Sequence, residues 1–523
     1  MRKYNILIVS AFAIGNLWAQ KKPAQDWFFG EPCKKNMGIS VNEAYNSVQG
    51  KLPSKTVVVA VIDGGTDVNH VDLKDVIWVN SKEIAGNGID DDKNGYIDDI
   101  NGWNFIGGAD GSMVGADNLE KVRIFKKLDN KYKDVKPEDV NGDNPEYNKY
   151  QMWKMEINQE REAYGNIYKQ LKPAYDALNG IKKGTGKDNP TAADIEAMKT
   201  NDMALQMIKG KIVEIMTKNK LQFADLYSEI SEQFQQVDVR ANFQNNPDFD
   251  SRKIVGDNYA NSSERYYGNN NVVGPDASHG THVAGIIAAT RNNNIGMNGI
   301  ADNVKIMVVR VVPDGDERDK DVANGIRYAV DNGAQIINMS FGKAFSWDKN
   351  IVDSAVAYAE SKNVLLVHAA GNDGENNDFE SNYPNDSLWG GQRFAANWIE
   401  IGASQPKRKM LATSFSNYGK NNVDLFSPGQ DIYSTIPGDK YAYFNGTSMA
   451  APAAAGVAAL VWSRFPNLTA VQLKQVLMES SVKVDKKVIL PGTKKDKVNF
   501  KDISVCGGLI NAKNALEMAS QMK

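Results

Sequence analysis

Hydrophobic residues form short continuous runs in two regions of this chain. Between these two regions, they recur with the period of an α-helix. Residues 56–62 are one such run, mostly β-branched, as is typical of a strand buried on both faces. Similar runs lie at 304–309, 335–339, 364–369, 398–403 and 423–426, and helical patterns at 320–332 and 351–362 separate some of them. This alternation predicts an α/β fold built on a doubly wound, mostly parallel sheet.

Between residues 111 and 251 the period becomes helical. Apolar residues recur at intervals of three and four in three sets, at 164–178, 195–215 and 226–237. Thr191, with Asp194 three residues later, is typical of a helix start. We therefore predict an all-helical insertion, either a hairpin or three helices, inside the α/β domain.

The first residues of the chain have the pattern of a signal peptide. Arg2 and Lys3 precede an apolar stretch, residues 6–18, and Ala19 follows. The predicted division is therefore a signal peptide at 1–19, the α/β domain at 20–110 and 252–523, and the insertion at 111–251. No later run is long enough to span a membrane. We expect an exported protein with no transmembrane segment in the mature chain, located in the periplasm, on the outer surface or in the medium.

Net charge and cysteine content further limit the kinds of protein that this sequence can encode. The net charge of −3 gives no reason to expect nucleic acid as a partner. The two cysteines, Cys33 and Cys506, exclude a scaffold built on disulfides. In an exported protein they could pair, and two separate thiols are the alternative.

Residues 90–101 have the spacing of an EF-hand calcium loop. The oxygen ligands would be the side chains of Asp90, Asp92, Asn94 and Asp98 and the main-chain carbonyl of Tyr96. Gly95 stands at the tight-turn position, but Asn101 replaces the usual final glutamate. We predict structural calcium here, with a solvated acidic turn as the alternative.

Ser448 stands where an apolar helix is predicted to begin. Gly446 and Thr447 precede it, and residues 450–462 are nearly all small or aliphatic. Main-chain N–H groups in the first turn of a helix have no partner in the helix, and they favour negative charge beside the serine hydroxyl. Pro452 is tolerated in or just past this turn.

Three other polar residues lie beside the predicted strands and helices. Asp63 ends the first strand, where the active sites of open α/β sheets form. His279 begins a helix of small residues, and Asn372 follows the strand at 364–369. His368 lies inside that strand and is predicted to belong to the core.

In chain order, the stretches 63–65, 279–285, 369–372 and 446–452 resemble the sequence motifs of the subtilisin-like serine proteases, or subtilases. The resemblance implies that Ser448 is the nucleophile and His279 the general base. It implies that Asp63 orients the histidine and that Asn372 donates its amide to the oxyanion. The protein would then be an exported serine endopeptidase that acts on proteins or peptides.

The resemblance also implies a substrate site and a second calcium site. Extended substrate would pair with the edge formed by Ser340, Phe341 and Gly342, and Ala369, Ala370 and Gly371 would complete the wall of the first specificity pocket. Asp72 and Asn293 would be side-chain ligands of calcium.

Two departures from the family pattern stand out. Gly64 replaces the usual serine after the aspartate. The segment between residue 19 and Asp63 is too short for the usual folding pro-domain, so we expect the chain to fold unaided or the insertion to act as chaperone or lid. A non-catalytic binding protein, which keeps the fold and holds a partner with its helices, is the alternative function.

Overall fold

The computed structural model describes residues 22–522, apart from 34–35, 49–52 and 141. The predicted signal peptide, 1–19, lies outside the described residues. In the described part, no helix is both long enough and apolar enough to cross a membrane. The described residues form two compact units: the helical unit, within 116–250, and the α/β unit, which combines those of 22–115 with those of 251–522.

The α/β unit contains a nine-stranded sheet in the order β12-β15-β9-β8-β5-β4-β1-β3-β2. Its strands are β1 (Val57–Asp63), β2 (Gly102–Asn104), β3 (Val304–Arg310), β4 (Ile336–Met339), β5 (Leu365–Ala369), β8 (Trp398–Ser404), β9 (Leu425–Pro428), β12 (Val482–Lys483) and β15 (Gly508–Leu509). All neighbouring strands pair in parallel except β12 and β15. The predicted α/β fold with a mostly parallel sheet is confirmed.

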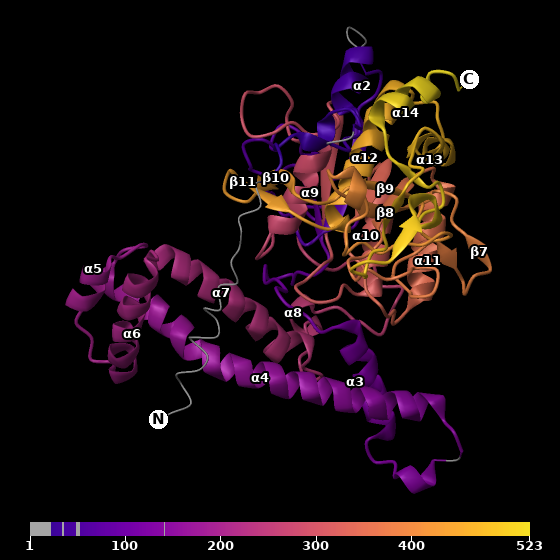
Figure 1. Ribbon diagram of the computed structural model, residues 1–523. Coiled ribbons are helices and arrows are strands. Elements are labelled where there is room, and N and C mark those ends of the chain that lie inside the picture. Colours follow the sequence, from indigo (N-terminus) through magenta and orange to yellow (C-terminus); the bar gives the residue numbers. More distant parts are fainter. Residues whose placement is uncertain (1–21, 34–35, 49–52, 141, 523) are drawn as a thin grey trace. The chain divides into compact units, whose positions relative to one another are not determined.

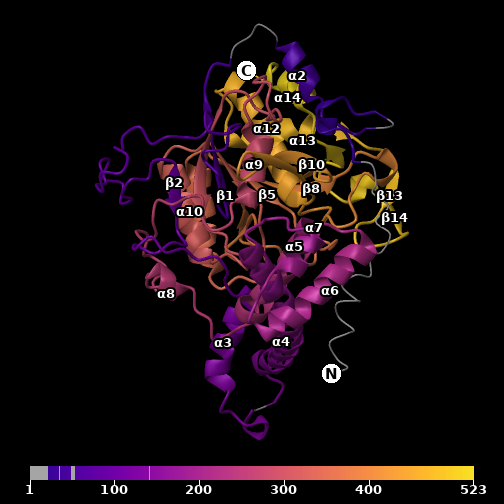
Figure 2. The same cartoon turned by 90° about the vertical axis from the view of Figure 1, so that its left-hand side faces the viewer.

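Helices cover both faces of this sheet. Val59 and Val61 of β1 belong to one apolar cluster, while Ala60 and Ile62 belong to another, because neighbouring side chains of a strand point to opposite faces. The first cluster includes α2 (Val41–Ser47), α9 (Ser278–Ala288), α12 (Thr447–Arg464), α13 (Ala470–Glu479) and α14 (Ala512–Ala519). The second includes α10 (Asp319–Asp331) and α11 (Lys349–Ser361). Figure 2 shows α10 and α12 on either side of β1.

Three small antiparallel ribbons complete the α/β unit. They pair β6 (Ser387–Leu388) with β7 (Arg393–Phe394), β10 (Ile432–Ile436) with β11 (Lys440–Phe444), and β13 (Lys487–Ile489) with β14 (Lys497–Asn499). Single 3-10 turns lie at Trp27–Phe29, Arg408–Met410 and Phe500–Asp502.

The helical unit is built around one long helix, α4 (Pro145–Thr185), with α3 (Glu120–Tyr132) along its first part (Figure 1). Its last part packs with α6 (Met203–Asn219) and α7 (Phe223–Val239) around a small apolar core, and α5 (Ala192–Ala197) joins α6. A 3-10 turn (Pro137–Asp139) and a π-helical turn (Arg240–Gln244) complete it. The predicted start at Thr191 is confirmed: its hydroxyl accepts from the Asp194 amide in a capping box.

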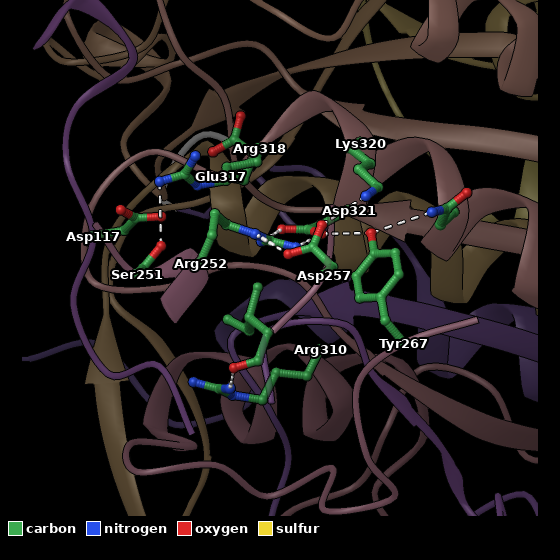
Figure 3. A network of polar contacts seen from close by, with 12 residues as sticks. Asp117, Ser251, Arg252, Asp257, Tyr267, Arg310, Glu317, Arg318, Lys320 and Asp321 are labelled. Carbon is green, nitrogen blue, oxygen red and sulfur yellow. Dashed lines mark hydrogen bonds and ion pairs between the residues drawn. The ribbon is translucent and has the colours of Figure 1, made fainter. Parts of the chain in front are cut away.

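A buried polar network ties the segment after residue 251 to α10 (Figure 3). Arg252, in the short helix α8 (Arg252–Val255), contacts Asp257 at 2.6 Å and Asp321 at 2.7 Å. Lys320 reaches Asp257 at 2.6 Å, and the Tyr267 hydroxyl donates to Asp321. Because removing one partner from such a network leaves a buried charge uncompensated, typically at a cost of about 3–5 kcal/mol, it holds this segment firmly on α10.

Candidate active site

Asp63 is the last residue of β1, and its side chain is almost fully buried. It lies beside Arg310 at the end of β3, since the two residues are paired in register. The Gly64 amide donates to Asp63 Oδ1 at 2.8 Å, and Arg310 Nε donates to the Gly64 carbonyl, also at 2.8 Å. The turn after β1 therefore holds this carboxylate in one orientation.

His279 is the second residue of α9 and faces Asp63. Its Nδ1 lies 2.8 and 3.0 Å from the two carboxylate oxygens. Helix α9 comes this close because residue 280 is glycine: a Cβ there would lie 2.2 Å from the Gly65 carbonyl oxygen. The histidine side chain is still 44% exposed. Asp63 thus fixes the ring on its Nδ1 side and leaves Nε2 for the reacting group.

The contact with Asp63 also changes the acid–base behaviour of His279. Burial by itself lowers the pKa of an imidazole, because it disfavours the charged form. Here the negative charge and hydrogen bond of Asp63 outweigh burial, with a smaller contribution from Asp276, and the pKa of His279 is raised above its ordinary value. The site therefore stabilises the imidazolium that forms when this histidine takes up a proton.

Ser448 is the second residue of α12, as its motif predicts. Its hydroxyl donates to the Ser340 carbonyl at 3.0 Å, and the Ser340 hydroxyl donates to the Ser448 carbonyl at 3.0 Å. In an uninterrupted helix, the N–H of residue 452 would bond that carbonyl. Pro452 has no N–H, so Ser340 satisfies the carbonyl instead.

The hydroxyl of Ser448 is hydrogen-bonded to Ser340 and not to His279. Among the described residues, no hydrogen bond joins Ser448 Oγ to His279 Nε2. Catalytic contacts in substrate-free sites are commonly long and tighten when substrate binds. Rotation of the Ser448 side chain about its first torsion angle would release the hydroxyl from the Ser340 carbonyl and let it donate to another acceptor, as the proposed role of His279 Nε2 requires.

Asn372 follows β5 and is exposed. Its Oδ1 accepts from the Thr447 amide at 2.8 Å and from the Thr447 hydroxyl at 3.1 Å. These two bonds fix which end of the amide is the acceptor. Asn372 Nδ2 and the N–H of Ser448, at the start of α12, are then two donors beside the serine.

The predicted substrate walls lie at the same edge of the sheet. Residues 340–342 follow β4, and 369–371 span the end of β5, which pairs with β4 in parallel. Because β4 also pairs with β1, both walls lie at the carboxyl edge that carries Asp63.

Two other histidines are structural. His368 is fully buried in β5 and its Nδ1 contacts Glu400 at 2.9 Å, so its assignment to the core is confirmed. His282 is also fully buried, and its Nε2 lies 3.1 Å from the carbonyls of Ile432 and Ala442. Burial lowers the pKa of His282 to about 3, so this ring is neutral at ordinary pH.

The acidic loop gathers three carboxylates that could hold a metal ion. The ligand oxygens of Glu83, Asp90 and Asp92 lie within 4.8 Å of one another. The loop spacing predicts the two aspartates but not Glu83, which precedes the loop and has no place in its pattern. The side chain of Asn94 is hydrogen-bonded within the protein: its Oδ1 accepts from the Tyr96 amide and its Nδ2 donates to Asp99.

Asp98 contacts the turn that precedes the acidic loop. Its two carboxylate oxygens accept hydrogen bonds from the main-chain amides of Gly86, Asn87 and Gly88. The carboxylate therefore holds the preceding turn, and Glu83 is the third acidic group beside Asp90 and Asp92.

The predicted second calcium pair is in contact but already hydrogen-bonded. Asp72 is fully buried, and Asn293 Nδ2 donates to its Oδ1 at 2.6 Å. The Met297 amide and the Tyr441 hydroxyl reach its Oδ2 at 3.2 and 3.3 Å. Asn293 thus presents a donor to Asp72, whereas a shared cation needs acceptors from both side chains.

The two cysteines do not pair. Both Cys33 and Cys506 are free thiols, and Cys33 is exposed. The sequence is compatible with a disulfide bond between these two cysteines or with two separate thiols. This structure has the two separate thiols.

Comparison with known proteins adds an independent line of information. The profile of the subtilase family matches residues 54–502. The chain is 38% identical over 240 residues to the thermophilic serine proteinase of Bacillus sp. (strain AK1), covering 46% of this chain and 53% of that protein. It is 38% identical over 204 residues to subtilisin BL of Lederbergia lenta, covering 39% of this chain and 70% of that protein.

Other relatives share only part of their length with this chain. The match to the cell wall-associated protease of Bacillus subtilis (strain 168) is 38% identical and covers 41% of this chain and 22% of that protein. Among solved structures, a protease from Pseudoalteromonas arctica PAMC 21717 is 29% identical with a TM-score of 0.39, covering 48% of this chain and 74% of that one. The chain spans about half the length of the thermophilic proteinase that it matches. On the extent of the profile match, this chain belongs to the subtilase family.

Proposed function

We propose that the protein is an exported serine endopeptidase that cleaves peptide bonds through an acyl-enzyme on Ser448. One observation carries the proposal: His279 is held by Asp63 at 2.8 Å, while Ser448 stands at the start of α12 beside Asn372. An alcohol is a weak nucleophile until a base takes its proton, and these four groups supply the base, its orienter, the nucleophile and an oxyanion donor.

In the first half of the reaction, His279 Nε2 takes the proton of Ser448 as Oγ attacks the peptide carbonyl. Asp63 remains ionised and stabilises the imidazolium, in keeping with the raised pKa of His279. When the tetrahedral intermediate collapses, the C–N bond breaks and His279 passes its proton to the leaving amine. An ester between Ser448 and the acyl part of the substrate remains.

In the second half, a water molecule takes the place of the amine. His279 accepts a proton from this water, which attacks the ester carbonyl, and then returns the proton to Ser448 Oγ as the C–O bond breaks. A carboxylic acid leaves and the enzyme is restored.

The oxyanion of both tetrahedral intermediates would lie between two donors, Asn372 Nδ2 and the Ser448 N–H. The Thr447 contacts support this role, because they preorganise the amide before substrate arrives. Extended substrate would pair its main chain with Ser340, Phe341 and Gly342, which makes recognition largely independent of sequence away from the pocket.

Calcium is the proposed structural ion, and the acidic loop is its better site. Glu83, Asp90 and Asp92 provide clustered carboxylate oxygens, the ligands that calcium prefers. A bound ion would neutralise their mutual repulsion and hold the loop. Asp72 and Asn293 are the second proposed pair, and calcium would there have to displace the hydrogen bond between them.

The helical unit is proposed to assist folding or to act as a lid. Its own apolar core and its position within the chain, between two parts of the α/β unit, support a distinct task. The signal-peptide pattern supports export.

Hydrolysis of casein and of p-nitroanilide peptides by the purified protein tests the proposal. Wild-type protein should cleave both, and Ser448→Ala should be folded but slower by about 10⁶-fold in kcat, the loss known for removal of the nucleophile in subtilisin. Chelation should lower the thermal midpoint of wild type, and Glu83→Gln should reduce that response. Folded wild-type protein without hydrolysis would contradict the enzyme and favour a binding protein.

A further inference from the structure

Asn382 lies in the loop between β5 and β6 and is half-buried. Its Nδ2 donates to the Ala369 carbonyl at 3.0 Å. On its other side, a Cβ built on Gly342 would lie only 2.3 Å from Asn382 Oδ1. The Asn382 amide therefore fits against the bare Cα of Gly342 and contacts both proposed substrate walls at once.

We propose that Asn382 closes the pocket between these walls, so that the protease cleaves after residues with small side chains. This inference rests on the proposed function and names its substrate class. A large side chain in the residue before the cleaved bond would have to enter the space of the Asn382 amide. It would then break the bond to Ala369 and leave a polar group without a partner, which is unfavourable in a desolvated pocket.

The loop that carries Asn382 is held against movement. The amides of Tyr383 and Lys343 each donate to the other's carbonyl, at 2.9 and 3.0 Å. The Lys343 ammonium is buried and contacts Asp319 at 2.8 Å, and Asn385 Nδ2 donates to the Asn382 carbonyl at 3.0 Å. Moving Asn382 out of the pocket would therefore disturb a main-chain bridge and strain a buried ion pair.

Space for a larger side chain exists beside Asn382. A cavity of about 380 Å³ is lined by Asn382 together with Glu380, Asp386, Phe394 and Glu400. Asn382 both lines this cavity and contacts Ala369 and Gly342, so we expect that removing its side chain opens the space between the two walls toward the cavity. In the proposal, the wild-type side chain therefore sets the depth of the pocket.

The test uses p-nitroanilide peptides that differ only in the residue before the cleaved bond. Wild-type protein should have a kcat/KM at least about tenfold higher with Ala than with Phe at this position, in the range that a hydrophobic pocket achieves by size. Asn382→Gly should raise the ratio of Phe to Ala at least about tenfold. Asn382→Ser, which keeps a polar group but is shorter, should move the ratio the same way if the glycine variant does not fold.

A control and a reciprocal change sharpen the test. Asn422 lines the same cavity and donates to the Asn377 carbonyl, so Asn422→Ala should leave the ratio unchanged. Gly342→Ala should lower activity because its methyl group meets Asn382, and Gly342→Ala combined with Asn382→Gly should recover part of it.

The outcomes separate this inference from the proposed function. An active wild-type enzyme that cleaves after Phe as fast as after Ala would overturn the inference alone. So would an Asn382→Gly variant with the wild-type ratio. Wild-type protein that cleaves no peptide and no casein would overturn the proposed function and this inference with it.

Discussion

The longest helices of the two units show how differently packing constrains sequence. In α12, every residue except Ser448 and Arg464 is buried, and most of the helix is alanine, glycine or valine. In α4, only seven of 41 residues are buried, and they lie in two short stretches. Small residues are required where a helix packs on all sides, whereas one apolar stripe is enough for a helix with a solvent face.

This difference explains what each helix can be used for. The surroundings of α12 fix its first turn tightly, so a serine placed there has a defined environment and, in the proposed site, two nearby donors for an oxyanion. The core of α4 determines a packing face but leaves most positions open. Small changes to side chains around the candidate active site of the α/β unit should therefore alter activity strongly. The helical unit should tolerate many substitutions.

After removal of the nucleophile itself, the largest effect is expected from Asp63→Asn. The variant loses the charge that orients and stabilises the imidazolium, and kcat should fall about 10⁴-fold. Since Asp63 raises the pKa of His279, the acid limb of kcat/KM should move to lower pH in this variant. Asp276→Asn should move the limb in the same direction by less, and an unshifted limb in both variants would contradict the assignment of His279.

Asn372→Ala should lower kcat by about 10²–10³ with little change in KM, because the amide acts on charge that develops in the transition state. Asn372→Asp keeps the acceptor for the Thr447 amide but has no donor, so it should lose at least as much. Rates of peptide hydrolysis at saturating and at limiting substrate concentrations give kcat and KM separately. A less than threefold loss in both variants would remove Asn372 from the oxyanion site.

Replacing residues 116–250 with a short Gly/Ser linker directly tests the difference between the helical unit and the α/β unit. We expect the yield of refolded active enzyme to fall several-fold, while kcat per titrated active site changes little. Refolding from urea, followed by active-site titration, measures both. A normal yield together with normal kcat would exclude a chaperone or lid role for the helical unit.

The smallest effect concerns His282 and pH. Its pKa is about 3 in the folded protein but near 6.5 in an unfolded chain, so the unfolded state binds more protons between these values. Its stabilising contribution is complete above about pH 6.5 and declines as the pH falls toward 3. Urea unfolding should show a weaker decline from pH 6.5 to 4 in His282→Gln. Parallel curves for the two proteins would contradict the neutral ring.

The features that could be predicted from sequence are those set by neighbours along the chain. The run at 56–62 predicts a fully buried strand, and β1 lies one residue further on, at Val57–Asp63. The period in 164–178 predicts part of α4, and Thr191 with Asp194 predicts the start of α5. Each signal is local, because helix and strand periods and caps involve residues close in sequence.

The remaining features depend on contacts between distant parts of the chain. Nothing near Glu83 indicates that it joins Asp90 and Asp92, and no local pattern shows that the Ser448 hydroxyl turns to Ser340. Asn382 contacts residues 13 positions away on β5 and 40 positions away after β4, through side-chain fit alone. The ribbon of β10 and β11 was not predicted either, because its strands lack a continuous apolar run.

Labelling of the folded wild-type protein with a fluorophosphonate probe, followed by peptide mapping, tests the central claim most directly. The probe reacts with a serine only where a base and an oxyanion site activate it. We expect a single modified peptide that contains Ser448, and no modification in Ser448→Ala. Folded wild-type protein that remains unlabelled, or is labelled at another serine, would contradict the account.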